Sequence, residues 1–200
     1  MASPKTISAR PKRKISARYP LKTADFDYIL PPSLIAQKPK KRRDSAKMLT
    51  LNRATGVTTH QKFIDLPNVL RAGDVLVLND SGVIPARLHG RKICGGANVE
   101  MLLLEEINES DWWAMLRPGK RLPPGTQILL HNKRDRPTEI IATVQKKNAA
   151  GHARLKFEGT KNFLAVLDQL GEAPLPPYIR RPTGSHSTDT TRYQTIFANT

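Results

Sequence analysis

Residues 79–88, with the sequence NDSGVIPARL, hold the side chains most suited to chemistry. They follow the apolar run 75–78, which predicts a buried strand, and Asn-Asp-Ser-Gly is typical of a turn at the end of a strand. Asp80 is the best candidate for a general acid or base, because sites in α/β proteins often form at strand ends. Asn79 could orient a hydroxyl or an amide, and Arg87, on the strand leaving the turn, could bind a phosphate or carboxylate. The alternatives are turn capping by Asn79 and Asp80 and a structural ion pair for Arg87.

Further candidates for substrate binding are polar or aromatic side chains elsewhere in the chain: Arg43, Asp44, Tyr178, Arg192, Tyr193 and Gln194. The two tyrosines could stack on an unpaired base or donate a hydroxyl, with packing as the alternative. Arg192 and Gln194 are predicted on one face of an extended segment, where they would line a site or meet solvent. Asp44 could serve a site or form a salt bridge with Arg43.

Metal and cysteine chemistry receive no support from the sequence. The five histidines form no close pair and have no carboxylate at metal-ligand spacing, so no metal site is expected. The single cysteine, Cys94, can form no disulfide within the chain, which fits a reducing cytoplasm. No phosphate-binding glycine loop occurs, and no apolar run approaches the ~20 residues that span a bilayer.

The charge of the chain indicates a polyanionic partner. The formal net charge is +16 and the isoelectric point is about 10.3, so nucleic acid is the first partner to consider. Residues 1–22 hold seven basic side chains and no acid and are predicted to be a disordered tail, either RNA-binding or merely solvated. Residues 38–43 add five basic side chains, for which RNA contact is favoured.

A small closed β-barrel is predicted over residues 83–159. Short strand-like runs at 99–104, 112–116, 126–130, 139–144 and 153–157 alternate with Gly- and Pro-rich turns, and closure would hide their edges. Trp112 and Trp113 cannot both point inward on a strand, so one is expected in the core and the other on the surface, where it packs or stacks.

The flanking residues predict a second domain of α/β (α+β) class. Residues 48–63 resemble a hairpin, and the apolar spacing at 163–170 predicts a helix, with Gly171 at a left-handed C-cap. The barrel is therefore expected to be inserted into a discontinuous α/β, barrel-like domain made of residues 23–82 and 160–200.

Several motifs in register resemble the S-adenosylmethionine:tRNA ribosyltransferase-isomerase family of queuosine biosynthesis. Besides 79–88, they are DFDY at 25–28, LIAQKP at 34–39, RDSAKML at 43–49, PGKRL at 118–122, LPPYI at 175–179 and RYQT at 192–195. The resemblance covers about residues 23–200. The chain differs from the family pattern at Gly82, usually basic, and at Ala46 and Lys47, usually Ser and Arg. It ends at Thr200, where the family continues into segments thought to line the S-adenosylmethionine site, so it resembles the N-terminal part of such an enzyme.

The resemblance implies a reaction. The ribosyl group of S-adenosylmethionine would be transferred to 7-aminomethyl-7-deazaguanine at the tRNA wobble position and rearranged, giving epoxyqueuosine, while adenine and methionine leave. A base must remove a proton from the acidic carbon beside the sulfonium, and an acid must help adenine depart. The resemblance also implies S-adenosylmethionine as a substrate, no metal, tRNA with a GUN anticodon, a monomer and a cytoplasmic location.

Two alternatives to this enzyme remain open. The charge and the small barrel would suit a non-catalytic RNA-binding module, which has no reason to bind S-adenosylmethionine. An inactive fragment would present an unfinished strand edge at residues 193–197.

Overall fold

The computed structural model describes residues 21–181 and 188–198 and divides into two compact units, Met1–Ile35 and Ala36–Thr200. In the first unit, the described residues form two short 3-10 helices, η1 (Thr23–Phe26) and η2 (Pro32–Leu34). Proline at the first position of η2 needs no N–H partner there. The predicted basic tail lies outside the described residues, except for Leu21 and Lys22.

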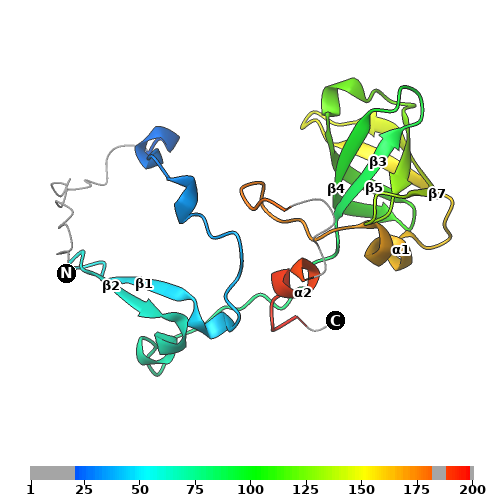
Figure 1. Cartoon of the computed structure of the whole chain (residues 1–200). Helices are drawn as coiled ribbons and strands as arrows, with labels where there is room; N and C mark the ends of the chain where they lie inside the picture. The colour runs from blue at the N-terminus through cyan, green and yellow to red at the C-terminus, as the bar shows by residue number, and fades with distance from the viewer. Residues whose placement is uncertain (1–20, 182–187, 199–200) are drawn as a thin grey trace. The chain divides into compact units, whose positions relative to one another are not determined.

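The second unit begins with the predicted hairpin. After η3 (Arg43–Ser45), the antiparallel strands β1 (Lys47–Leu51) and β2 (Thr58–Lys62) pair in register, and η4 (Phe63–Asn68) follows (Figure 1). The hairpin turn contains Gly56 at φ +73°, a conformation that glycine adopts without strain. The hairpin prediction is confirmed.

A closed antiparallel barrel forms the core of the second unit, with strand order β3-β4-β5-β8-β7-β6 (Figure 1). Its elements are β3 (Arg87–Lys92), β4 (Asn98–Asn108), β5 (Asp111–Arg117), the 3-10 helix η5 (Gly119–Arg121), β6 (Gln127–His131), β7 (Pro137–Lys147) and β8 (Ala153–Glu158). Strand β3 closes the barrel by pairing with both β4 and β6. This closure needs Gly90, because a Cβ there would lie 2.5 Å from the Leu129 carbonyl oxygen on β6.

Alternating side chains fill the barrel. Leu88, Met101, Ile128 and Leu155 are buried from four different strands, while their neighbours in sequence point outward. The predicted division of the tryptophans is also found: Trp112 is buried and the next residue, Trp113, is only partly buried. The chain is therefore a mixed α/β protein with a closed antiparallel barrel, as the sequence predicted.

Helix α1 (Phe163–Leu170) packs on the barrel core. The Phe163 ring stacks on Phe157 with 3.7 Å between centroids, and the Asn162 side chain caps the helix by accepting a hydrogen bond from the Ala165 N–H at 3.0 Å. The helix ends before Gly171 as predicted, but the predicted left-handed cap is wrong, because Gly171 has φ −95°. Glycine is needed there for space, since an added Cβ would collide with the Pro85 carbonyl group.

Two predicted strands are not formed. Residues 75–78 have no strand pairing, and Val75 and Val77 are 88% and 87% exposed, because no described strand lies beside them to complete their hydrogen bonds. The segment containing Arg192 forms helix α2 (Asp189–Tyr193). The Arg192 backbone N–H donates to the Thr188 carbonyl at 3.0 Å. The predicted strand edge at residues 193–197 is therefore wrong, and so is the shared strand face for Arg192 and Gln194.

Within the part of the chain that the structure describes, no helix combines the length and the apolar character needed to cross a membrane.

Candidate functional site

Residues from motifs far apart in the sequence meet through hydrogen bonds in the second unit. The Gln37 side chain donates to the Tyr178 carbonyl at 3.0 Å and accepts from the Arg180 N–H at 2.8 Å. Arg181 donates to the Gln37 carbonyl at 2.8 Å, so one glutamine is held by three successive contacts with the 178–181 segment.

The same junction uses three of the predicted site residues. Arg43 donates to the carbonyls of Thr191 and Arg192 at 3.3 and 3.2 Å, and the Arg192 guanidinium donates in return to the Lys40 carbonyl. The Gln194 side chain accepts from the Val83 N–H at 2.8 Å and donates to the Val83 carbonyl at 2.5 Å. These side chains join the motifs at 37–43, 79–88 and 175–195, and their observed contacts are with backbone groups.

Five other predicted residues contribute no side chain to this network, although the backbone carbonyl of one of them, Tyr178, accepts from Gln37. Asp44 forms a salt bridge with Arg42 at 2.6 Å, and this guanidinium lowers the pKa of the Asp44 carboxyl. The salt bridge with Arg43 considered from the sequence is not formed, because the Arg43 side chain donates to carbonyls of α2. The Asn79 side chain accepts from the Ser81 N–H at 3.0 Å, which is the turn contact considered for it. Asp80 is exposed within the unpaired 74–86 stretch, and Tyr178 and Tyr193 are exposed.

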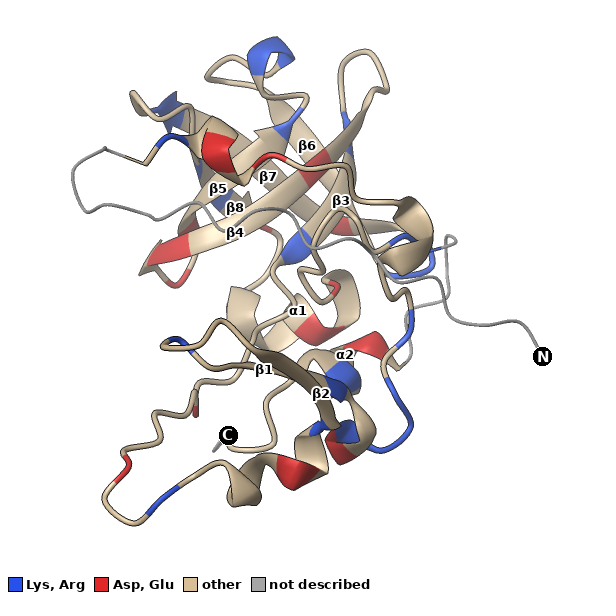
Figure 2. Ribbon diagram, turned by 90° about the vertical axis from the view of Figure 1, so that its left-hand side faces the viewer, with Lys and Arg blue, Asp and Glu red and all other residues tan. Residues whose placement is uncertain are grey.

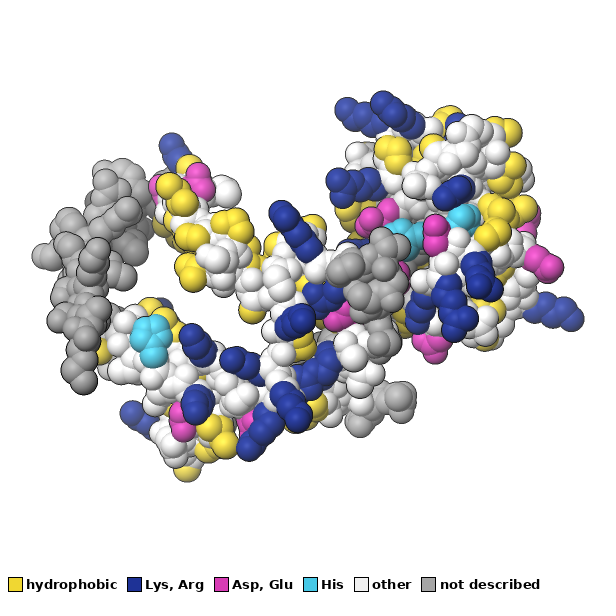
Figure 3. Space-filling model, in the orientation of Figure 1, with side chains coloured by type: hydrophobic (Ala, Val, Ile, Leu, Met, Phe, Trp, Pro, Cys, Tyr) yellow, Lys and Arg dark blue, Asp and Glu magenta, His cyan; other side chains and the backbone are white. Residues whose placement is uncertain are grey.

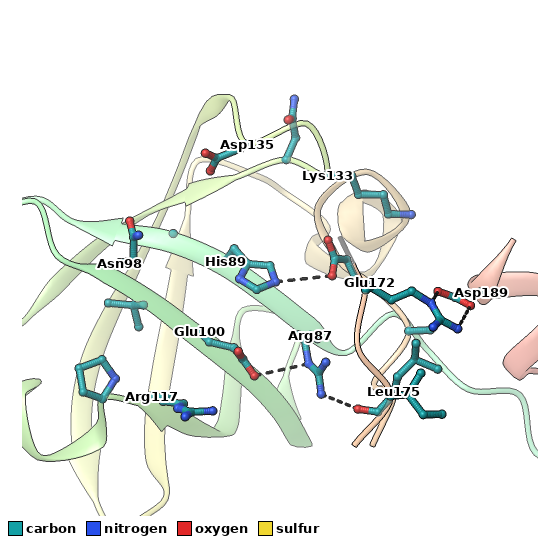
Figure 4. A pocket seen from close by; sticks show the side chains of 17 residues that line it. Arg87, His89, Asn98, Glu100, Arg117, Lys133, Asp135, Glu172, Leu175 and Asp189 are labelled. Carbon is teal, nitrogen blue, oxygen red and sulfur yellow. Dashed lines mark hydrogen bonds and ion pairs between the residues drawn. The ribbon is translucent and has the colours of Figure 1, made fainter. Parts of the chain in front are cut away.

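A cavity of about 690 Å³ lies beside strands β3 and β4, where the chain leaves α1 (Figure 4). Of the predicted site residues, only Arg87 lines it. The Arg87 guanidinium donates to the Leu175 carbonyl at 2.7 Å, and its Nε lies 3.5 Å from Glu100 Oε1. The Arg87 guanidinium therefore lies between a carbonyl and a carboxylate. Its ion pair with Glu100 agrees with the alternative interpretation of Arg87, a structural ion pair.

Two further charge pairs line this cavity (Figure 4). His89 Nε2 lies 3.6 Å from Glu172 Oε2, and this carboxylate raises the pKa of His89. Arg181 forms two hydrogen bonds with Asp189, at 2.6 and 2.9 Å, which raise the pKa of Arg181. The lining therefore carries both signs of charge and includes a titratable histidine.

Sequence reasoning missed the His89–Glu172 pair. The two residues meet because the backbone of Arg87 bonds reciprocally to that of Glu172, by N–H to carbonyl contacts of 3.2 and 2.8 Å. No local sequence pattern predicts the bridge between Arg87 and Glu172, because it depends on how the chain returns to β3 after α1. Among residues 21–181 and 188–198, no group of His, Cys, Asp and Glu side chains is arranged to hold a metal ion.

A match to a family model identifies the class of this protein. The family model described as "Queuosine biosynthesis protein" matches residues 23–200, and the chain belongs to this family.

Relatives in this family carry a more specific name. The chain is 44% identical over 180 residues to a protein of Dehalococcoides mccartyi and 44% identical over 197 residues to one of Nostoc sp., both named S-adenosylmethionine:tRNA ribosyltransferase-isomerase. These matches cover 90% and 88% of this chain but 50% and 48% of the relatives. The chain therefore spans about half the length of the curated relatives it matches.

A solved structure gives a partial match. The S-adenosylmethionine tRNA ribosyltransferase of Thermotoga maritima is 39% identical, with 66% of this chain and 44% of that chain covered and a TM-score of 0.32. This sequence identity agrees with the family match.

Proposed function

We propose that this chain is part of an enzyme that transfers and isomerises the ribosyl group of S-adenosylmethionine onto 7-aminomethyl-7-deazaguanine in tRNA. The observation that carries the proposal is the family match over residues 23–200, together with the names of relatives at 44% identity. The same resemblance supports tRNA with a GUN anticodon as the acceptor, a monomeric enzyme and a cytoplasmic location. S-adenosylmethionine is a substrate here, and the reaction as proposed needs no metal.

The contacts between distant motifs support a discontinuous domain. Gln37, Arg43 and Gln194 each bond across more than 100 residues of sequence, with separations of 141, 148 and 111 for three of these bonds. We infer that residues 23–82 and 160–200 belong to one domain into which 83–159 is inserted. In that domain the exposed apolar run 75–78 would gain a strand partner from the half of the family's length that this chain does not span.

Asp80 remains our candidate for the group that moves a proton. It is an exposed carboxylate next to the Asn79 turn, and the nearby Val83 backbone is fixed by Gln194. The reaction needs a base for the carbon beside the sulfonium, and a carboxylate at this place could supply it. Arg43, Asp44, Asn79, Arg87, Tyr178, Arg192, Tyr193 and Gln194 complete the proposed substrate-binding set.

Adenine release tests the proposed reaction. The chain would be assayed alone and after extension with the second half of the D. mccartyi relative, using S-adenosylmethionine and tRNA that carries the aminomethyl-deazaguanine base. We expect release only from the extended protein, in step with base modification. A folded extended protein that binds both substrates and releases no adenine would refute the proposed transfer.

A pair of variants tests Asp80 in the extended protein. Asp80→Asn should lower the rate by about 100-fold or more, the usual contribution of general acid–base catalysis. The matched control is Asp168→Asn, because Asp168 is also an exposed carboxylate but lies on helix α1. This variant should leave the rate unchanged. Equal rates for the two variants would remove Asp80 from the mechanism.

A further inference from the structure

Two long stretches of the barrel sequence are free of acidic side chains. Residues 112–134 and 140–157 contain no Asp or Glu, although they run through most of strands β5 to β8. Lys and Arg in these stretches include Lys120 and Arg121 on η5, and Lys146 and Lys147 near the tip of the β7–β8 hairpin. We call these four residues the basic rim.

The basic rim is a single surface because η5 and the β7–β8 hairpin touch. Lys147 Nζ donates to the Gly119 carbonyl at 2.6 Å, which fixes the hairpin against the first residue of η5. The Gly125 N–H donates to the Val144 carbonyl at 2.7 Å and extends this contact. In Figure 2, the η5 coil at the top of the barrel is blue, and Figure 3 shows Lys and Arg side chains projecting from that end.

The charges of the basic rim are not neutralised locally. Lys120, Arg121 and Lys146 are exposed and have no ion-pair partner within the described parts of the chain. Asp111, at the start of β5, is already bound to Arg154 at 3.0 Å, and the Arg154 guanidinium lowers its pKa. Such a surface attracts an anion that can span several cations.

An aromatic ring lies beside the basic rim. Trp113 is on the outer face of β5, opposite Arg154 on β8, and the ammonium of Lys146 is 5.9 Å from its ring centroid. A partly exposed indole next to cations provides a stacking face for a base and contacts for its phosphates. This combination favours RNA over an anionic membrane or an acidic protein, neither of which presents planar bases.

The acidic side chains of the barrel indicate where the RNA would not lie. Glu105 and Glu106 on β4 pair with Trp113 and Trp112 on β5, toward the β4–β5 hairpin, which is the end of β5 away from η5. Repulsion from these carboxylates would keep phosphates at the η5 end.

We propose that the basic rim and Trp113 form the surface of the barrel that binds tRNA, with phosphates on the rim cations and an unpaired base on Trp113. The choice of tRNA rests on the proposed function, but binding is measured without turnover. If no adenine were released, the proposed reaction would fail, but the tRNA-binding proposal would still be decided by the binding measurement alone.

The charge component is tested by the salt dependence of affinity. Fluorescence anisotropy would measure binding of the full chain to labelled, unmodified tRNA over a series of KCl concentrations. The triple variant Lys120→Ala, Arg121→Ala, Lys146→Ala should reduce the slope of log K against log[KCl] by about two, because each single-strand phosphate contact contributes about 0.7. The control Arg53→Ala, Arg71→Ala, Lys161→Ala removes three other exposed cations and should change the slope much less. Equal slopes for the two triple variants would overturn the proposal.

The stacking component is tested at Trp113. Trp113→Ala should weaken tRNA binding by about 10-fold with the salt slope unchanged, and Trp113→Phe should restore most of the affinity. Unchanged affinity of Trp113→Ala would contradict base stacking. If the charge variant lost binding to anionic phospholipid vesicles as strongly as binding to tRNA, with no preference for RNA in the wild type, the RNA assignment would be wrong.

Discussion

Gly171 occupies a position where even one additional methyl group should separate two parts of the second unit. A Cβ built there would lie well inside 3.0 Å of the Pro85 carbonyl oxygen and 2.9 Å from the Pro85 carbonyl carbon. Neither atom belongs to a side chain that could rotate away. Gly171→Ala must therefore shift the backbone by roughly an ångström to restore ordinary van der Waals separation.

The shift would strain the hydrogen bonds on both sides of Gly171. These are its own N–H to the Leu167 carbonyl, at 2.7 Å, and the reciprocal pair between Arg87 and Glu172, at 3.2 and 2.8 Å. Each backbone hydrogen bond contributes about 0.5–1.5 kcal/mol net, so losing all three should lower the free energy of unfolding by about 1.5–4.5 kcal/mol. Gly171 has φ −95°, so the penalty comes from the collision and not from backbone strain.

Urea unfolding monitored by tryptophan fluorescence measures this effect, because Trp112 is buried in the barrel core and meets the Phe163 ring edge-on at 6.4 Å. The control is Gly82→Ala, whose Cβ would have no atom within 4 Å and whose φ is not in the left-handed region. It should change the free energy of unfolding by about 1 kcal/mol or less. If Gly171→Ala unfolds at the same urea concentration as the wild type, the close approach of residues 85 and 171 is not required for stability, and the reasoning is refuted.

Three other predictions concern the barrel and its helix. Phe163→Ala should lower the free energy of unfolding by about 3–5 kcal/mol because its ring is buried in the core, whereas Leu164→Ala, on the exposed face, should cost less than about 0.5 kcal/mol in the same urea titration. Asn162→Ala removes the helix cap and should cost about 1 kcal/mol; an unchanged thermal midpoint would contradict this. Glu172 raises the pKa of His89 above 6.5, so their pairing stabilises the fold fully below pH 6.5 and is lost as pH rises through the raised value. Glu172→Gln should lower the His89 pKa in an NMR titration, and an unshifted titration would show that the pair does not form in solution.

The barrel could be predicted from the sequence because its signal is local. Alternating burial along β8 follows directly from alternating apolar residues, and Gly-rich turns separate the strands. The hairpin β1–β2 and helix α1 were predicted for the same reason. Each of these elements depends on residues that are close in sequence, so a pattern of a few residues is enough to identify it.

The features that the sequence did not predict correctly depend on residues that are distant in the sequence. The apolar run 75–78 has strand propensity but no described neighbour to pair with, and residues 189–193 form a helix despite the extended pattern expected at 192–194. The charged cavity depends on the contact between Arg87 and Glu172, which are separated in the sequence by the rest of the barrel. The sequence motifs identify Arg43 and Gln194 as candidates, but their bonds to backbone groups of other motifs depend on how distant segments of the chain meet.

The bridge between Arg87 and Glu172 also has a mechanical consequence. The chain enters the barrel at β3 and returns to the same strand after α1, where two backbone hydrogen bonds join the incoming and outgoing segments. A pulling force applied to the chain on either side would load these two bonds, together with the contacts of Arg87 with Leu175 and of Gln194 with Val83, before it reached the strands between them. The barrel should therefore stay folded under tension until these contacts break.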